Sequence, residues 1–262
     1  MKEKDFYNSP LASVYYDYAE DTNQSFSQMK EFFLLSKYIR NADKICEFWC
    51  WAGGKIGSFL SLQKELSLFG IDISTYAIEK AKQTFPGISF QIGDISNTSY
   101  QDNEFDITCS FFVYEHLRDP LPVFNEMYRT TKKWGLLFLW FPNYGSPFFP
   151  SPPSLFWKSI FSKISLILQR ILSLSPKIHN NVDPIVWVLF QPDYDTTAEI
   201  HMKYFVDYIE KNYSLKIEHA ESKWEQILGG NILFKIYYPL FLLRRTKFFR
   251  YLWPQCFLIL RK

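Results

Sequence analysis

Residues 44–57, with the sequence KICEFWCWAGGKIG, constrain the fold more than any other part of the chain. They combine a short apolar run with a turn that contains two consecutive glycines and leads into a segment of helical character. An apolar run of this length is typical of a strand buried on both faces, and glycine favours a sharp turn after it. A strand, a tight turn and a helix in this order form the first unit of a parallel α/β sheet.

Three further apolar runs alternate with helical or turn-forming segments. We expect strands at residues 66–72, 88–92 and 105–110, and a helix over residues 75–85 that begins after Ser74, whose hydroxyl suits an N-cap. This alternation predicts a doubly wound, mostly parallel α/β sheet. In such sheets a ligand binds beyond the carboxyl ends of the strands, where a glycine-rich turn lets backbone N–H groups approach a nucleotide-like molecule.

Acidic residues accompany the first three predicted strands. Glu47 lies within the first strand, Asp72 ends the second, and Asp94 follows the third. Asp72 comes about 20 residues after Gly53, which is close to the spacing at which an acid on a second strand accepts hydrogen bonds from ribose hydroxyls. The sequence therefore places three carboxylates near one predicted ligand-binding edge.

With these residues in order, the chain resembles the class I S-adenosylmethionine-dependent methyltransferases over residues 44–143, in particular those that modify small molecules and lipids. The resemblance implies a seven-stranded Rossmann-like sheet and S-adenosylmethionine as the cofactor. The loop from Trp49 to Gly53 would then wrap the methionine part, and the acids would hold the ribose and the adenine. The implied cofactor-binding residues are Glu47, Trp49, Trp51, Gly53, Asp72, Ile73, Asp94, Ile95, Ser110 and Phe111.

Three tryptophans stand where this family has glycine, namely Trp49 and Trp51 in the loop and Trp134 before the expected fifth strand. An indole allows neither the backbone freedom nor the close ligand approach that glycine gives. One interpretation is a cofactor-free pseudo-methyltransferase that acts as a binding or scaffold protein. The other is a misread codon, because some bacterial genetic codes read UGA as glycine and others as tryptophan. Glycine is only 10 of 262 residues, below the usual level of about 7%.

A nicotinamide-dependent oxidoreductase is a third alternative, because it also uses a strand, a glycine turn and an acid on the second strand. It does not predict Glu47 within the first strand together with the Gly93-Asp94 pair and the YEHL end of the fourth strand at residues 114–117. These three features favour the methyltransferase interpretation.

Methyl transfer depends mainly on positioning the acceptor and excluding water. If the acceptor is a hydroxyl, a base helps, and His116 is our candidate because it follows the fourth strand on the ligand side. Glu115 is a weaker catalytic candidate. We expect a small or amphiphilic molecule with a hydroxyl or carbon acceptor. The candidates for lining its pocket are Tyr15, Tyr16, Tyr144, His201 and Tyr204.

The chain divides into four predicted segments. Residues 155–174 place apolar side chains on one helical face, which predicts a lid or pocket helix packed on the core, with contact to a membrane interface as the alternative. We expect the last two strands at residues 215–218 and 255–260, and the resemblance implies that the final one is antiparallel. The segments are a helical cap (1–43), a cofactor-binding α/β core (44–143), a Pro-rich helical insertion (144–198) and a C-terminal helix with the last strands (199–262).

Composition narrows the range of partners. The net charge of +2 gives no electrostatic reason to expect nucleic acid. The four cysteines fall in predicted core strands and favour buried thiols over a metal site. The charged N-terminus does not resemble a signal peptide, so we expect a cytoplasmic protein, with peripheral membrane association as the alternative.

Overall fold

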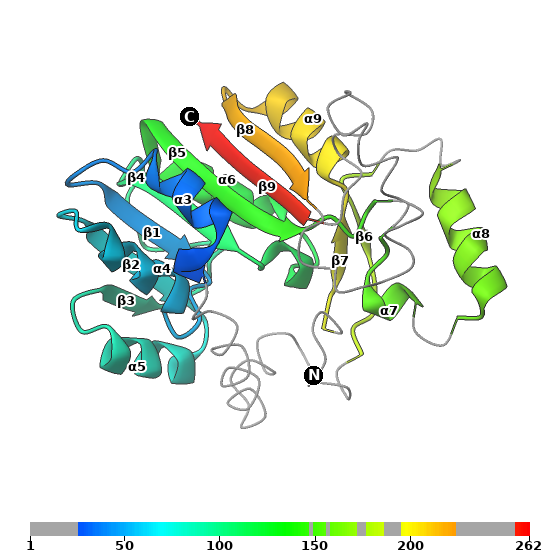
Figure 1. Cartoon of the computed structure of the whole chain (residues 1–262), viewed down its shortest axis with the longest axis horizontal. Coiled ribbons are helices and arrows are strands. Elements are labelled where there is room, and N and C mark those ends of the chain that lie inside the picture. The colour runs from blue at the N-terminus through cyan, green and yellow to red at the C-terminus, as the bar shows by residue number, and fades with distance from the viewer. Residues whose placement is uncertain (1–25, 147–148, 156–157, 172–176, 186–194, 224–254) are drawn as a thin grey trace. The chain divides into compact units, whose positions relative to one another are not determined.

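The computed structural model describes residues 26–146, 149–155, 158–171, 177–185, 195–223 and 255–262 (Figure 1). Its contacts group the chain into two compact units, which are described separately below. The first comprises residues 1–110, 121–138 and 261–262, and the second comprises residues 111–120 and 139–260. The predicted boundaries at residues 44, 144 and 199 remain predictions, and Tyr15 and Tyr16 lie outside the described residues.

The described strands form a seven-stranded sheet in the order β3-β2-β1-β4-β5-β9-β8 (Figure 1). The central strand β1 pairs in parallel with β2 and β4, and β2 pairs in parallel with β3. The predicted α/β class with a mostly parallel sheet is therefore confirmed. The strands are β1 (Lys44–Phe48), β2 (Ser67–Asp72), β3 (Ser89–Ile92), β4 (Phe105–Phe111), β5 (Thr131–Pro142), β8 (Lys216–Lys223) and β9 (Gln255–Arg261).

The last strand runs against its neighbour, as the resemblance implies. The backbone N–H of Trp134 donates to the carbonyl of Lys262 at 2.7 Å, and the indole of Trp140 donates to the side chain of Gln255 at 3.1 Å. Residue numbers rise along β5 as they fall along β9, so the two strands are antiparallel.

Helices connect the strands of the first unit. The side chain of Ser74 accepts a hydrogen bond from the N–H of Ala77 at 3.3 Å, which confirms the predicted N-cap. Within the predicted helical cap (1–43), the longest described helix, α3, ends at Ser36. The helical elements that lie wholly in this unit are η1 (Phe26–Gln28), α3 (Lys30–Ser36), α4 (Gly54–Ser58), η2 (Phe59–Leu62), α5 (Thr75–Thr84) and α6 (Leu121–Thr130).

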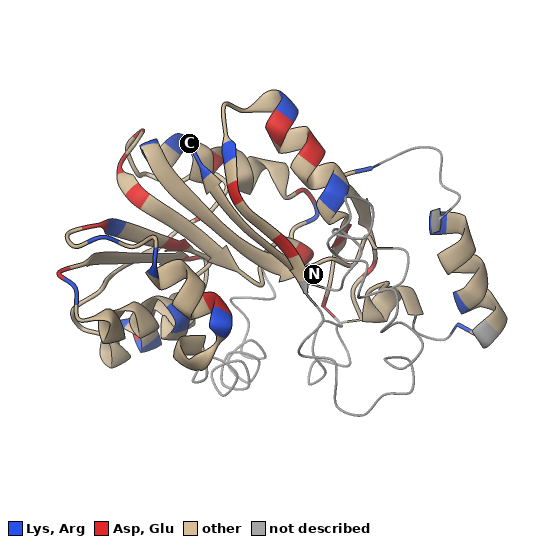
Figure 2. Cartoon of the chain, turned by 45° about the horizontal axis from the view of Figure 1, so that its top comes forward, with Lys and Arg blue, Asp and Glu red and all other residues tan. Residues whose placement is uncertain are grey.

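The second unit contains the insertion. The helix expected over residues 155–174 is confirmed in its middle part, where α8 runs over residues 160–171, and residues 156–157 and 172–176 lie outside the described part. Figure 2 shows acidic and basic residues interspersed along the last helix, α9. The elements are η3 (Tyr114–His116), α7 (Pro152–Leu155), α8 (Ile160–Ile171), α9 (Met202–Asn212) and an antiparallel pair of short strands, β6 (His179–Asn181) with β7 (Ala198–Ile200).

Aromatic side chains fill the interior of each unit. In the first unit, the ring centroids of Phe26 and Phe59 each lie 5.6 Å from that of Phe32, so the segment before β1 packs against η2. In the second unit, Tyr114 stacks on Phe141 with ring centroids 5.1 Å apart. Aromatic pairs of this kind stabilise a fold beyond the area that they bury.

A buried carboxylate holds α6 to the loop that follows β3. Arg129 donates to both oxygens of the Glu126 carboxylate at 2.8 and 2.7 Å, and the N–H and hydroxyl of Thr98 donate to Glu126 at 2.7 and 2.6 Å. Burial opposes ionisation, but the hydrogen bonds from Arg129 and Thr98 prevail and hold the pKa of Glu126 below its ordinary value.

We expect Glu126→Gln to lower the free energy of unfolding by about 1–3 kcal/mol at neutral pH, because it removes the ion pair between Glu126 and Arg129. The difference should shrink as the pH falls below the ordinary glutamate pKa of 4.5. A carboxyl whose folded-state pKa is depressed stabilises above its ordinary pKa and loses that contribution as the pH falls through the folded value. Urea unfolding of both proteins measures this. The exposed Glu79→Gln on α5 is the control, with a change below about 0.5 kcal/mol, and equal losses in the two variants would contradict the prediction.

Candidate functional site

The loop after β1 is fixed by backbone hydrogen bonds. The N–H of Cys50 donates to the carbonyl of Ile71 at 3.0 Å, and the N–H of Gly53 donates to the carbonyl of Cys50 at 2.9 Å. Gly53 is the N-cap of α4 and has a φ of 80°. A Cβ at this position would lie 2.7 Å from the ring of Phe90, so the turn requires glycine here both for its backbone conformation and for its packing.

Trp49 and Trp51 lie in the same loop, and both also have left-handed backbone conformations. Their φ angles are 63° and 54°, and their side chains are buried, at 6% and 8% exposed. Both indoles therefore fill space beside the loop that the resemblance assigns to a cofactor.

Glu47 connects β1 to the start of α4. Its carboxylate is buried and accepts a hydrogen bond from the N–H of Ile56 at 2.9 Å. Burial raises the pKa of Glu47 to about 8, the nearby charge of Asp72 acts in the same direction, and Lys55 and the Ile56 N–H oppose the shift. Glu47 is thus positioned to organise the loop, as the resemblance implies.

Glu47→Gln should remove one contribution to the pH dependence of stability. A carboxyl with a raised folded-state pKa stabilises the fold fully below its ordinary value of 4.5 and loses this contribution as the pH rises through about 8. Across this range we expect the unfolding free energy of the parent to fall relative to that of the variant by a few kcal/mol, on the order set by about 1.4 kcal/mol per pKa unit. Glutamine resembles the protonated acid and keeps an oxygen for Ile56.

Urea unfolding at a series of pH values tests this expectation. Glu65→Gln is the control, because Glu65 is exposed, and this variant should retain the parental pH dependence. A constant difference between Glu47→Gln and the parent over the whole range would show that Glu47 is ionised in the folded protein.

Asp72 joins the ends of three adjacent strands. Its buried carboxylate accepts hydrogen bonds from the N–H groups of Trp51 and Ser74, both at 2.9 Å, and its carbonyl accepts one from the N–H of Gly93 at 2.9 Å. The next residue, Ile73, is half-buried. The loop after β1, the end of β2 and the turn after β3 therefore meet at one edge of the sheet.

Asp94 and Ile95 follow β3 at this edge. One oxygen of the Asp94 carboxylate accepts hydrogen bonds from the N–H and the hydroxyl of Ser96, at 3.0 and 2.7 Å, and Ile95 is buried. Ser110, near the end of β4, is also buried within the first unit. The first unit thus brings its predicted residues to the carboxyl ends of β1, β2 and β3, whereas Phe111 belongs to the second unit.

The second unit holds the candidate catalytic residues in η3. His116 is buried, with Nδ1 3.2 Å from a carboxylate oxygen of Asp195 and Nε2 3.8 Å from one of Glu115. The carbonyl of Glu115 accepts a hydrogen bond from the N–H of Thr197 at 2.8 Å, which anchors the segment that carries Asp195. The sequence analysis missed Asp195, because nothing in the chain's local pattern links it to a histidine 79 positions earlier.

The substrate candidates Tyr144, His201 and Tyr204 come from segments that the structure brings together. The N–H of Gly145 donates to the carbonyl of Ile200 at 2.9 Å, so Tyr144 and His201 lie on adjoining segments, and the rings of His201 and Tyr204 are 4.3 Å apart. Burial lowers the pKa of His201 to about 4. His201 is therefore neutral near pH 7.

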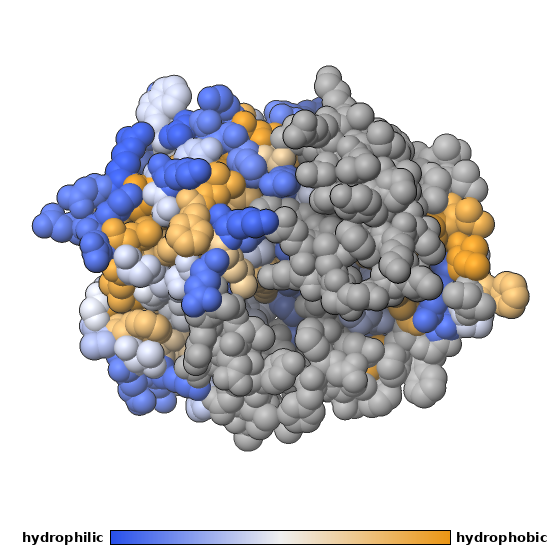
Figure 3. Space-filling view, in the orientation of Figure 1, coloured by the Kyte–Doolittle hydropathy of each residue, from blue (hydrophilic) through white to orange (hydrophobic). Residues whose placement is uncertain are grey.

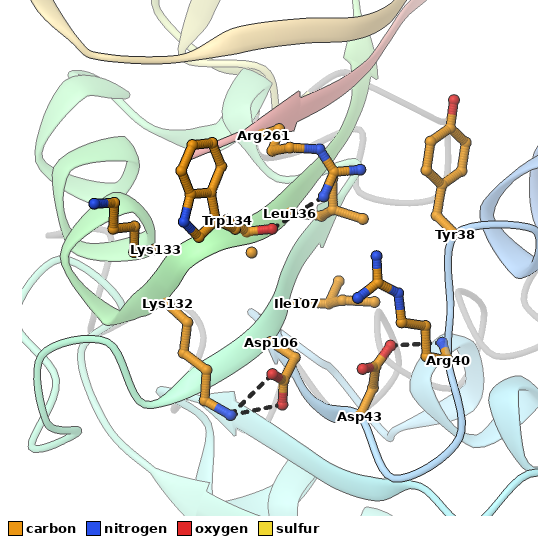
Figure 4. Close-up of a pocket in the computed structure, with 11 residues that line it drawn as sticks. Tyr38, Arg40, Asp43, Asp106, Ile107, Lys132, Lys133, Trp134, Leu136 and Arg261 are labelled. Carbon is orange, nitrogen blue, oxygen red and sulfur yellow. Dashed lines mark hydrogen bonds and ion pairs between the residues drawn. The ribbon is translucent and has the colours of Figure 1, made fainter.

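A cavity of about 140 Å³ lies at the opposite ends of the strands, within the first unit (Figure 4). Lys132 donates to both carboxylate oxygens of Asp106 at 2.9 Å, and Arg261 donates to the carbonyl of Trp134 at 3.0 Å. These charged groups are engaged in fixing strand ends, and the cavity contains none of the predicted site residues.

The described residues include no group of three or more His, Cys, Asp or Glu side chains arranged to hold a metal ion. Their four cysteines are buried and form no disulfide. Among the same residues, no helix is long and apolar enough to cross a membrane.

Comparison with known proteins agrees with this geometry. Residues 52–139 match the family model of a methyltransferase domain. The chain is 29% identical over 112 residues to an uncharacterized methyltransferase of Schizosaccharomyces pombe, covering 38% of this chain and 40% of the relative. It is 25% identical over 132 residues to a demethylmenaquinone methyltransferase of Paenarthrobacter aurescens, covering 49% of each. This chain therefore spans half or less of the length of these relatives.

A solved structure shows the same fold. The phosphoethanolamine N-methyltransferase 2 of Haemonchus contortus, in complex with S-adenosyl-L-methionine, aligns with a TM-score of 0.59 at 12% identity, covering 100% of this chain and 60% of that one. Residues 52–139 thus match a methyltransferase domain, and the chain shares the fold of this solved methyltransferase structure.

The site fits S-adenosylmethionine only in part. Asp72 and Asp94 place carboxylates at the ends of neighbouring strands, where hydroxyl and amine groups of a nucleoside can be bound. Trp49 and Trp51 do not fit, because a loop that wraps a ligand with its backbone cannot carry buried indoles on the same residues. The described geometry accordingly supports the nucleoside end of the cofactor and conflicts with its methionine end.

Proposed function

We propose that this protein is an S-adenosylmethionine-dependent methyltransferase whose acceptor is a small or amphiphilic molecule. The observation that carries the proposal is the position of Asp72, whose carboxylate binds the loop after β1 and whose carbonyl binds the turn after β3. This arrangement gathers a glycine turn, a ribose-type acid and a third-strand acid at one edge of a methyltransferase domain. A nicotinamide-dependent oxidoreductase is less favoured, because the matched family has a different chemistry.

The printed names of the relatives support a small acceptor. One relative is named for demethylmenaquinone, and the solved structure is named for phosphoethanolamine. A hydroxyl or carbon acceptor in this protein would need a group that receives a proton. His116 is the residue that we assign to this role, since the carboxylates of Asp195 and Glu115, at 3.2 and 3.8 Å from its two ring nitrogens, favour a protonated imidazole.

Calorimetric titration of S-adenosylmethionine tests the cofactor assignment. We expect Trp49→Gly/Trp51→Gly to bind it and the sequence as written to bind it weakly or not at all. Adding Asp72→Asn to the glycine variant should weaken binding by about 10- to 100-fold, the loss expected for a hydrogen bond to a charged group. Asp102→Asn is the control, because that carboxylate is mainly exposed and pairs with Arg129.

The outcomes separate the three interpretations. Preference for NAD over S-adenosylmethionine would favour an oxidoreductase. Absence of binding by both the parent and the glycine variant would favour a scaffold protein with a filled site.

We further propose that α8 contacts a lipid surface, which would suit an amphiphilic acceptor. Phe161, Ile164 and Leu168 are 81%, 49% and 52% exposed and recur at helical spacing, and Figure 3 shows exposed apolar residues of α8 at one end of the view. The prediction that this face packs on the core is wrong for Ile164 and Leu168. Exposed Lys158 precedes the helix, and a basic residue beside an apolar face favours anionic lipid.

Vesicle sedimentation tests this contact. Phe161→Asp/Leu168→Asp should lower partitioning onto phosphatidylcholine–phosphatidylglycerol vesicles by about tenfold or more, because each side chain contributes about 1.5–3 kcal/mol when it is buried in an apolar phase. The control is Leu60→Asp in η2, where the side chain is 54% exposed and should not contribute. Absence of vesicle binding by the parent, or an equal loss in the control, would exclude a specific role for α8.

A further inference from the structure

Three of the four tryptophans that the structure describes have a backbone conformation suited to glycine. The φ angles of Trp49, Trp51 and Trp134 are 63°, 54° and 68°, and only Trp140 is absent from the residues with positive φ. The left-handed region is uncommon for any residue with a Cβ, and a bulky aromatic residue there is an outlier. Ala42, Gln63, Asn103 and Phe112 are the other described non-glycine residues of this kind.

The conformation at positions 49 and 51 is imposed by contacts that do not involve the indoles. The N–H of residue 51 is held by the carboxylate of Asp72 at 2.9 Å. Residue 49 lies between Phe48, which is in register with Ile71, and Cys50, whose N–H donates to the carbonyl of Ile71 at 3.0 Å. The backbone is thus fixed on both sides, and the side chain must accept a positive φ.

At position 134, too, the backbone conformation is imposed by contacts that do not involve the indole, and the side chain is 69% exposed. The N–H of residue 134 donates to the carbonyl of Lys262 at 2.7 Å, and its carbonyl accepts a hydrogen bond from Arg261 at 3.0 Å (Figure 4). Arg261 and Lys262 therefore fix this part of β5 through the backbone groups of residue 134, without a contact to its indole. An exposed indole contributes little packing energy that could offset the unfavourable φ.

Trp140 shows the opposite pattern. Its side chain is 1% exposed, its indole N–H donates to Gln255 at 3.1 Å, and its ring contacts those of Phe112 and Phe257 at centroid distances of 4.8 and 5.8 Å. The hydrogen bond uses the indole N–H, and the ring contacts require an aromatic side chain. Trp140 is therefore suited to tryptophan, whereas positions 49, 51 and 134 are suited to glycine.

We propose that the natural protein has glycine at positions 49, 51 and 134 and tryptophan at position 140. The three glycines would share the codon UGA, which the source organism reads as glycine and which has been rendered as tryptophan in this sequence. At positions 49 and 51 this removes the indoles that conflict with the methionine end of the cofactor. The proposal itself rests on backbone geometry and does not require the proposed function.

The codons of the gene are the first test. We expect UGA at the three positions with positive φ and UGG at position 140. UGG at any one of the three positions would overturn the assignment of glycine there, and UGA at position 140 would overturn the assignment of tryptophan.

Thermal unfolding of the purified protein is the second test. Trp134→Gly should raise Tm by about 2–4 °C, because the unfavourable φ is relieved. Trp134→Ala is the matched control, because it removes the same exposed indole but keeps a Cβ, and its Tm should stay near that of the parent. Trp140→Gly should lower Tm by about 5 °C or more. A Tm for Trp134→Gly at or below that of Trp134→Ala would overturn the inference for this position.

The glycine inference and the proposed function fail in distinguishable ways. Codons and Tm values as expected, with no binding of S-adenosylmethionine by Trp49→Gly/Trp51→Gly, would leave the glycines in place and reject the cofactor. UGG codons together with binding by the parent would reject the glycines and leave the cofactor in place.

Discussion

The carboxylate of Asp72 is the group on which the candidate site depends. It is fully buried and accepts two backbone hydrogen bonds, one from the loop after β1 and one from the turn that begins α5. A buried carboxylate is stable only when its oxygens are bonded in this way, so the loop and the strand end form together. Because the N–H of residue 51 points at Asp72, the backbone there adopts a positive φ. The same hydrogen bond therefore fixes the loop and decides which residue the loop tolerates.

A second buried carboxylate has a comparable role in the second unit. Glu199, in β7, forms an ion pair with Arg170 of α8 and accepts hydrogen bonds from the N–H and hydroxyl of Ser151 at 2.8 and 2.7 Å. Arg170 also donates to the carbonyl of Tyr144 at 2.8 Å. The interior of the insertion is thus held by charge and hydrogen bonds, whereas Phe161, Ile164 and Leu168 of α8 are exposed. The packing on the core that the amphipathic pattern predicted is therefore wrong for Ile164 and Leu168, since periodicity identifies an apolar face without saying what covers it.

The sequence predicted the strands well because apolar runs bounded by turns depend on local signals. β2, β3, β4 and β9 begin and end within one residue of their predicted bounds. The insertion was less predictable, because its helix boundaries and the pairing of Arg170 with Glu199 depend on contacts between distant residues. The pairing of Asp195 with His116 is of the same kind. No periodic pattern marks a single acid in a loop, and only the folded chain places it 3.2 Å from the imidazole.

Two explanations are available for the three tryptophans with positive φ, namely loss of the cofactor and a misread codon. A site that loses its cofactor can gain bulky residues that fill it, and Trp49 and Trp51 are consistent with that history, because both are buried in the loop. Trp134 is not, because it lies near the start of β5, at the end of the strands opposite the loop, and its side chain is 69% exposed. It fills nothing, yet it has the same unfavourable backbone conformation. Loss of function accounts for two of the three residues, whereas a single misread codon accounts for all three and leaves Trp140, which needs its indole, unaffected.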